Sequence, residues 1–307
     1  MKRIIAFLSI SLLFFTACEQ TNDKKDADKL YIVTTTQMIA DAVRNIAGDQ
    51  AEVISLMGPG VDPHYYKATQ GDLEKLTKAD IIFYNGLHLE GKMQDVFEKF
   101  SKQRMVVAVS KDIAENELIV TSDQGQETIH DPHIWHSVNL WKNVVPVITE
   151  SLVSKDSENA SSYEENGSVF IEKLKNLDET TSAAISQIPK QQRLLITSHD
   201  AFNYFGKTYD IEVKGLQGIS TVSEIGIKDI TQMVDVIIKR KVKAVFVESS
   251  VNERNLRAVI EGCQKKNWEV QIGGTLFSDA MGADETPEGT YIGMIKYNTN
   301  AIVNALK

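Results

Sequence analysis

Cysteine is scarce in this chain, which has only Cys18 and Cys263 among its 307 residues. Cys263 ends a stretch, 255–263, whose apolar residues recur at helical spacing, so we expect a buried, inert thiol rather than a redox group or metal ligand. If Cys18 belongs to an export signal, as argued below, no intramolecular disulfide can form. The protein must then be stabilised by its hydrophobic core, and a chain of this length does so most naturally as two domains.

An excess of basic residues is also lacking. The chain carries 33 Lys and Arg against 42 Asp and Glu, a formal net charge of −9 at pH 7. Without a basic patch it is poorly suited to the phosphate backbone, so we expect no nucleic-acid partner. An acidic pI of about 5.3 is compatible with cation binding but is too common to indicate it.

Residues 1–18 have the pattern of an export signal. A positively charged start precedes an apolar run, 4–15, which is too short for a permanent membrane anchor. The run ends in Phe-Thr-Ala-Cys18, which resembles the lipobox of bacterial lipoproteins, although Phe15 stands where leucine is common. We therefore expect an exported protein anchored by lipid on Cys18 to the cell membrane, facing the periplasm or cell exterior. Residues 19–29 are predicted to be a flexible polar tether.

Short apolar runs then alternate with stretches of helical periodicity. In the first half, the predicted strands are 30–34, 52–57, 81–84 and 105–109, and the predicted helices are 37–47, 71–78 and 92–100, with a polar loop leading to His130. In the second half, the predicted strands are 194–197, 212–216, 244–247 and 272–277, and the predicted helices are 227–239, 253–265 and 290–306. This alternation predicts an α/β fold of two similar lobes, 30–155 and 189–307, each a parallel sheet flanked by helices.

The segment between the lobes, 156–188, contains no proline. From Tyr163 to Ile188 its apolar positions recur at steps of three and four, as in a helical rod of roughly 40 Å. Asn166 and Gly167 weaken the pattern, the glycine by about 1 kcal/mol, and two helices meeting near Asn166 are the alternative. We predict one long rigid helix that joins the lobes and resists a wide hinge motion.

Histidine is scarce as well, with six in the chain, yet two of them share one tripeptide. Asp-Pro-His64 and Asp-Pro-His133 each hold the histidine on a turn that proline stiffens. Imidazole is the commonest metal ligand, and a nearby carboxylate can orient its ring. One such tripeptide would suit an ordinary surface turn, but the recurrence favours two halves of one site.

The predicted strands bring two further residues to the same place. His64 and His133 follow strands of the first lobe, and His199 and Asp279 follow strands of the second. Ligands of open parallel sheets bind beyond the carboxyl ends of the strands, so these four side chains converge if the lobes face each other. Three imidazoles and one carboxylate suit zinc or manganese.

The remaining histidines and nearby carboxylates are assigned other roles. His88 alternates with leucines near a strand end and is interpreted as structural or as part of the rim. His130 and His136 flank the second tripeptide and are interpreted as surface groups or groups beside the ligands. Glu248 and Asp200 are candidate acceptors of hydrogen bonds from the ligands.

Together these motifs resemble the zinc- and manganese-binding lipoproteins that deliver metal to bacterial ABC importers, the cluster A-I substrate-binding proteins. The matching segments are Gly-Val-Asp-Pro-His64, His130-Asp-Pro-His133-Ile-Trp135, Ser-His199-Asp-Ala-Phe-Asn-Tyr-Phe205, Lys214-Gly-Leu-Gln-Gly-Ile-Ser220, Val247-Glu-Ser-Ser250 and Leu276-Phe-Ser-Asp279. The resemblance implies Zn2+ or Mn2+ as transported cargo, held by His64, His133, His199 and Asp279. It also implies a membrane permease with its cytoplasmic ATPase as partner, and we expect a monomer.

The chain departs from the family pattern in two ways. Residues 114–128 contain no histidine, so they do not form the histidine-rich loop of many zinc members. His199 stands where many manganese members have glutamate, so the site resembles the three-histidine subgroup. His136 stands where many relatives have other residues, and its sequence context assigns it no role.

Two other functional classes compete with metal binding for transport. A metal-dependent hydrolase could use three histidines and an open position to activate water. The sequence shows no clear general base, such as the Glu of a His-Glu-x-x-His helix, and four ligands leave water little room. A surface adhesin or interaction lipoprotein is the other class, but no repeat or low-complexity stalk supports it. We therefore expect a binding protein and not an enzyme.

Overall fold

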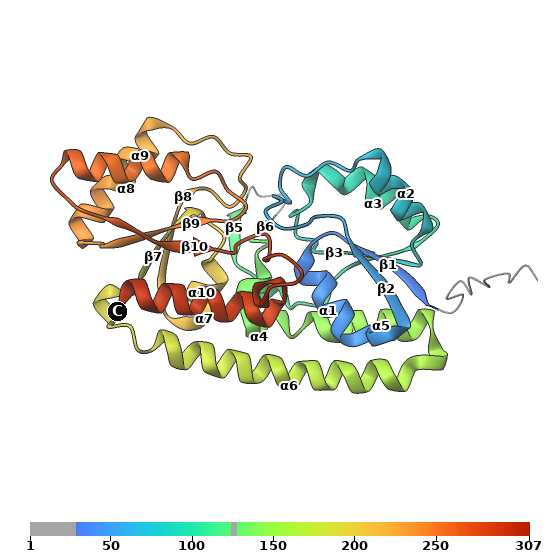
Figure 1. Cartoon of the computed structure of the whole chain (residues 1–307). Coiled ribbons are helices and arrows are strands. Elements are labelled where there is room, and N and C mark those ends of the chain that lie inside the picture. The colour runs from blue at the N-terminus through green and yellow to red at the C-terminus, as the bar shows by residue number, and fades with distance from the viewer. Residues whose placement is uncertain (1–28, 124–127) are drawn as a thin grey trace, which may run out of the picture.

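The computed structural model describes residues 29–123 and 128–307 and shows two α/β lobes above one long helix (Figure 1). The predicted fold class is confirmed. The predicted signal peptide with Cys18 and the tether lie outside the described residues, except for Lys29. Within the described part of the chain, no helix combines the length and apolar character needed to cross a membrane.

The first lobe is built on a four-stranded parallel sheet in the order β2-β1-β3-β4. Its strands are β1 (Leu30–Thr34), β2 (Ala51–Ser55), β3 (Ile81–Tyr84) and β4 (Met105–Ala108), and the helices between them are α1 (Gln37–Ala47), α2 (Gln70–Lys78) and α3 (Gln94–Ser101). Each element lies within two residues of its predicted bounds. Helix α2 begins with a capping box, in which Thr69 and Asp72 each accept a hydrogen bond from the other's backbone N–H.

The second lobe repeats the scheme with two parallel pairs, β7–β8 and β9–β10, and β7 lies beside β9. Its strands are β7 (Leu194–His199), β8 (Glu212–Gln217), β9 (Ala244–Glu248) and β10 (Gln271–Leu276). Its helices are α7 (Asn203–Tyr209), α8 (Ile227–Arg240), α9 (Arg254–Lys265) and α10 (Tyr291–Leu306). The carboxyl ends of the strands in both lobes therefore face the region between them (Figure 1).

Several elements were not predicted. The polar loop before His130 contains an antiparallel pair, β5 (Val120–Asp123) and β6 (Thr128–His130), and the first lobe continues through α4 (Val138–Trp141) and α5 (Val144–Lys155). Short 3-10 turns occur at Gly48–Gln50, Gly91–Met93, Glu115–Glu117, Ile134–His136, Ser157–Asn159, Lys190–Gln192 and Pro287–Gly289. Pro146 is tolerated in the first turn of α5, where its missing N–H leaves no helical hydrogen bond unmade.

The long connecting helix, α6 (Ala160–Ile185), is unbroken, so the prediction of a single helix is confirmed and the alternative of two helices is wrong. It is shorter than 156–188, since a 3-10 turn precedes it. Asn166 and Gly167, which weakened the helical pattern, allow α6 to pack closely on the first lobe. A Cβ on Gly167 would lie 2.8 Å from Thr149 Oγ1 on α5, and Asn166 donates to the Ile46 carbonyl at the end of α1. Close packing on the first lobe therefore offsets their poor helix propensity.

The two lobes share hydrophobic core next to α6. Tyr291, at the start of α10, stacks on Trp141 of the first lobe and donates its hydroxyl proton to the Trp135 carbonyl at 2.7 Å. Its backbone N–H donates to Asp41 on α1 at 3.2 Å. Met281, Met294 and several residues of α4, α5 and α6 belong to the same buried cluster. The lobes are thus joined by packing as well as by the helix.

This construction predicts a small change of shape on binding a ligand. The radius of gyration from solution X-ray scattering should be nearly the same for metal-free and zinc-loaded protein, because a continuous helix and a shared core leave little room for a hinge. A large compaction on adding Zn2+ would show that the helix bends, with Asn166 and Gly167 the first residues to replace.

Asp41 is expected to make stability depend on pH. Burial raises the pKa of its carboxyl to about 6, against a smaller opposing effect of the Tyr291 N–H, Arg44 and Lys173. The unfolded chain releases this proton at lower pH than the folded one, so stability falls as pH rises from about 4 to 6 and the cost persists above 6. Asp41→Asn cannot ionise and keeps an acceptor oxygen. Urea unfolding with chelator present should show it more stable than wild type by roughly 2–3 kcal/mol at pH 7 and similar at pH 4. An equal difference at both pH values would contradict this origin.

Candidate metal centre

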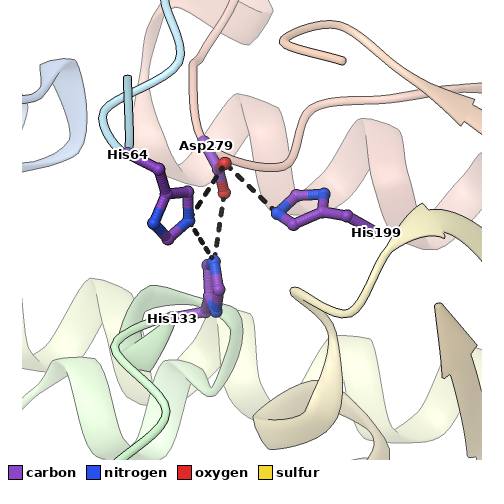
Figure 2. Close-up of side chains that lie close together, drawn as sticks. All are labelled: His64, His133, His199 and Asp279. Atoms are coloured by element: carbon purple, nitrogen blue, oxygen red, sulfur yellow. Dashed lines mark hydrogen bonds and ion pairs between the residues drawn. The ribbon is translucent and has the colours of Figure 1, made fainter. Parts of the chain in front are cut away.

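Four side chains from the two lobes meet between them (Figure 2). His64 lies in the loop after β2 and His133 follows β6, whereas His199 ends β7 and Asp279 lies in the loop after β10. All four are buried, and one ligand atom from each lies within 4.8 Å of all the others. The structure thus brings together every residue predicted as a metal ligand.

Asp279 stands at the centre of the cluster. Its Oδ2 lies 3.2 Å from His199 Nε2 and 3.8 Å from His64 Nε2, and its Oδ1 lies 3.5 Å from His133 Nε2. The Nε2 atoms of His64 and His133 are 3.2 Å apart. Tetrahedral zinc with bonds near 2.0–2.1 Å separates its ligand atoms by about 3.3 Å. The spacing of these atoms therefore fits a small divalent cation.

The repeated tripeptide is also a repeated structure. In each turn the aspartate Oδ1 accepts the backbone N–H of the histidine two residues later, at 2.8 Å for Asp62 and His64 and 2.9 Å for Asp131 and His133. Such a local bond fixes the turn, while proline restricts the backbone between the two residues. The histidines are buried, so ordinary surface turns are excluded.

Carboxylates orient two of the three rings. His133 Nδ1 lies 2.7 Å from Asp131 Oδ1, and His199 Nδ1 lies 2.5 Å from Glu248 Oε2. A proton on each Nδ1 leaves the Nε2 lone pair directed at the cluster, as a metal ligand requires. Glu248 therefore takes the role predicted for it. Asp200 does not, because its hydrogen bonds in the described part of the chain are with Asn203. It influences His133 and His199 through its charge alone.

The electrostatics of the cluster favour a cation. Burial lowers the pKa of His64 to about 4, so its ring is neutral. Burial alone would raise the pKa of Asp279, but His199, His133 and His64 hold it far below its usual range. Burial also opposes the charging of His199, yet Glu248 and Asp279 outweigh it and raise its pKa. A metal ion bound here would compete with a proton for Nε2 of His199. It would also satisfy the Asp279 oxygens, which are buried without a hydrogen-bond partner in the described structure.

The other three histidines lie outside the cluster. His88 is exposed on a turn whose backbone is left-handed at Gly86, Leu87 and His88. His130 is half-buried at the end of β6. His136 is buried rather than on the surface, with its ring against Phe202 at a centroid distance of 4.1 Å. Burial keeps the pKa of His136 well below its ordinary value, so the ring is neutral.

Sequence reasoning missed the residues that hold these loops across the lobes. Asn203 donates to Asp131 Oδ2 at 3.1 Å, and the hydroxyl of Tyr204 donates to the Asp131 carbonyl at 2.9 Å. Trp135 Nε1 donates to the Ser278 carbonyl, next to Asp279, at 2.8 Å. Each of these residues lies in a segment that carries the family resemblance, and this resemblance was the signal that could have identified them. The sequence alone does not indicate which of these distant segments contact each other.

Comparison with known proteins gives a consistent result. The family described as zinc-uptake complex component A, periplasmic, matches residues 32–305. Manganese-binding lipoprotein MntA of Bacillus subtilis (strain 168) is 45% identical over 305 residues, covering 99% of both chains. Zinc-binding protein TroA of Treponema pallidum (strain Nichols) is 44% identical over 292 residues, covering 95% of this chain and 94% of the relative. The solved structure of periplasmic zinc binding protein TroA from Treponema pallidum matches with a TM-score of 0.87 at 45% identity, over 91% of this chain and 99% of that one.

Two α/β lobes, a long connecting helix and a histidine-carboxylate cluster buried between the lobes define a substrate-binding protein. With these matches, the chain belongs to the metal substrate-binding lipoproteins of ABC importers, cluster A-I.

Proposed function

We propose that this protein is the extracytoplasmic subunit of an ABC importer that captures Zn2+ or Mn2+ between its lobes and delivers the ion to the membrane permease. The observation that carries the proposal is the convergence of His64, His133, His199 and Asp279, two from each lobe, on one buried point. The names of the relatives, one manganese-binding and one zinc-binding, support the same class of cargo.

Binding in this site follows from its chemistry. Carboxylates hold the rings of His133 and His199 in place before the ion arrives, so little ordering is needed on binding. The ion takes the place of the proton on His199 and neutralises Asp279. Because both lobes supply ligands, the bound ion holds them together, and release to the permease requires the lobes to separate slightly.

Metal analysis of the purified protein tests this function. Protein prepared without added metal, then equilibrated with Zn2+ or Mn2+ and desalted, should retain about one ion per chain, whereas His133→Ala should retain almost none. His88→Ala, which removes an exposed histidine, should behave like wild type. Wild-type protein that binds neither ion in competition with an indicator would overturn the proposal.

The proposal assigns transport rather than catalysis, in keeping with a family of substrate-binding proteins. The metal-dependent hydrolase is not favoured, since four converging ligand side chains leave little space for an activated water. Zinc-loaded protein should not hydrolyse ester, amide or phosphate substrates. The proposal also includes a monomeric protein, a permease with its ATPase as partner, and a lipid anchor at Cys18.

The lipid anchor gives a prediction of its own. Cells that express the protein and are fed a radioactive fatty acid should label the wild type and leave Cys18→Ala unlabelled, because the thioether at Cys18 is the attachment point of the diacylglycerol. Cys263→Ala keeps the Phe-Thr-Ala-Cys18 junction and should be labelled like wild type. Equal labelling of wild type and Cys18→Ala would rule out this anchor.

A further inference from the structure

The aspartate of each Asp-Pro-His turn has a second oxygen that faces the opposite lobe. In both turns Oδ1 accepts the N–H of the histidine. Asp131 Oδ2 accepts from Asn203, and Asp62 Oδ2 accepts from the hydroxyl of Thr221 at 2.6 Å. Thus each histidine turn of the first lobe is tied to the second lobe through its aspartate.

The two ties differ in their surroundings. Asn203 begins α7, and the neighbouring Tyr204 is anchored by bonds to the backbone of Asp131 and Ile119 and belongs to the shared core. Thr221 instead lies in the loop 218–226 between β8 and α8. Thr221 itself is buried, although the neighbouring Val222 is 44% exposed. The tie through Thr221 can therefore break without disrupting the core.

The loop is shaped to present this hydroxyl. Gln217, the last residue of β8, pairs with the ligand His199 on β7. Its side-chain amide donates to the carbonyl of Thr221 and, at 2.6 Å, to that of Ser223. A continuous path thus runs from His199 through Gln217, Thr221 and Asp62 to the backbone of His64, joining ligands of opposite lobes.

From this path we infer that the Thr221–Asp62 hydrogen bond is a latch that holds the lobes closed over the ion and slows its release. Thr221 is a positioning residue, since it acts on His64 through Asp62. The inference rests on the proposed function, because it concerns release of the same ion. A bond broken when the lobes part should affect the dissociation rate more than the association rate.

Stopped-flow release of Zn2+ from loaded protein into excess chelator tests the latch. Thr221→Val keeps the branched shape but lacks the hydroxyl, and should release Zn2+ roughly tenfold faster, as expected for losing a hydrogen bond to a charged acceptor. Its association rate and the melting temperature of its metal-free form should stay close to wild type. Thr221→Ser should restore slow release. Ser223→Ala is the matched control and should release Zn2+ like wild type, because the Ser223 hydroxyl donates to the Ser220 carbonyl within the same loop.

A second comparison separates the latch from a general effect on the loop. In an Asp62→Ala background, Thr221→Val should cause no further acceleration, because the acceptor is already gone. Acceleration that persists there, or an unchanged rate in Thr221→Val alone, would overturn the latch while leaving metal binding intact. Wild-type protein that binds no Zn2+ would instead overturn the proposed function, and the latch with it.

Discussion

Replacing Asp279 with alanine is expected to abolish the stabilisation that Zn2+ gives to the folded protein. A ligand that binds only the folded state adds about 4 kcal/mol at a thousand times its dissociation constant, which corresponds to a rise in melting temperature on the order of 10 °C. Asp279 is the only carboxylate of the cluster and lies within 3.8 Å of an Nε2 atom of each histidine. Without it, three neutral imidazoles must bind the ion with no negatively charged ligand.

The measurement is the difference between melting temperatures with Zn2+ and with chelator, taken for each variant separately. This difference removes the direct effect of a substitution on the metal-free fold. His64→Ala, His133→Ala and His199→Ala should each reduce it strongly, whereas the exposed His88→Ala should retain it. If His199→Ala or Asp279→Ala behaved like His88→Ala, the second lobe would contribute no ligand and the assigned site would be wrong.

The positions of the four clustered residues could be predicted from the sequence because local rules determine each of them. Alternation of strands and helices placed His199 and Asp279 at strand ends, and the repeated Asp-Pro-His marked His64 and His133 as a pair. The sequence could not show that the two lobes face each other. That arrangement depends on contacts such as Tyr291 with Trp141 and Asp41, which join residues far apart in the chain.

Helix α5 was missed for a different reason. Helix α5 is apolar on most sides, with Val144, Val145, Val147, Ile148 and Leu152 all buried, so it lacks the alternation of polar and apolar faces by which helices are recognised. Gly167 was interpreted as a weakness in α6, although the neighbouring α5 requires a small residue there. Helix propensity describes an isolated segment, whereas packing against a second segment decides these cases.

We expect the isolated protein to bind Zn2+ more tightly than Mn2+. Manganese prefers more and harder oxygen ligands, while zinc accepts four ligands and favours imidazole. Intrinsic affinity at nitrogen and oxygen sites also rises from manganese to zinc. Three histidines and Asp279 therefore favour zinc, with Asp279 able to bind through one oxygen or two. Transport of manganese in the cell would still be compatible with tighter binding of zinc, because metal availability also determines which ion is carried.

His199→Glu should shift the relative preference toward Mn2+. It replaces a nitrogen by a hard carboxylate, and it also removes the imidazole that Glu248 orients, so Zn2+ affinity should fall on the order of 10–100-fold and Mn2+ affinity much less. His199→Gln removes the same imidazole without adding charge, and should weaken both ions without favouring Mn2+. Competition titrations of Zn2+ against Mn2+ on all three proteins measure the ratio directly. A wild type that prefers Mn2+ would mean that ligand softness does not set selectivity here, and that the geometry imposed by the two lobes overrides it.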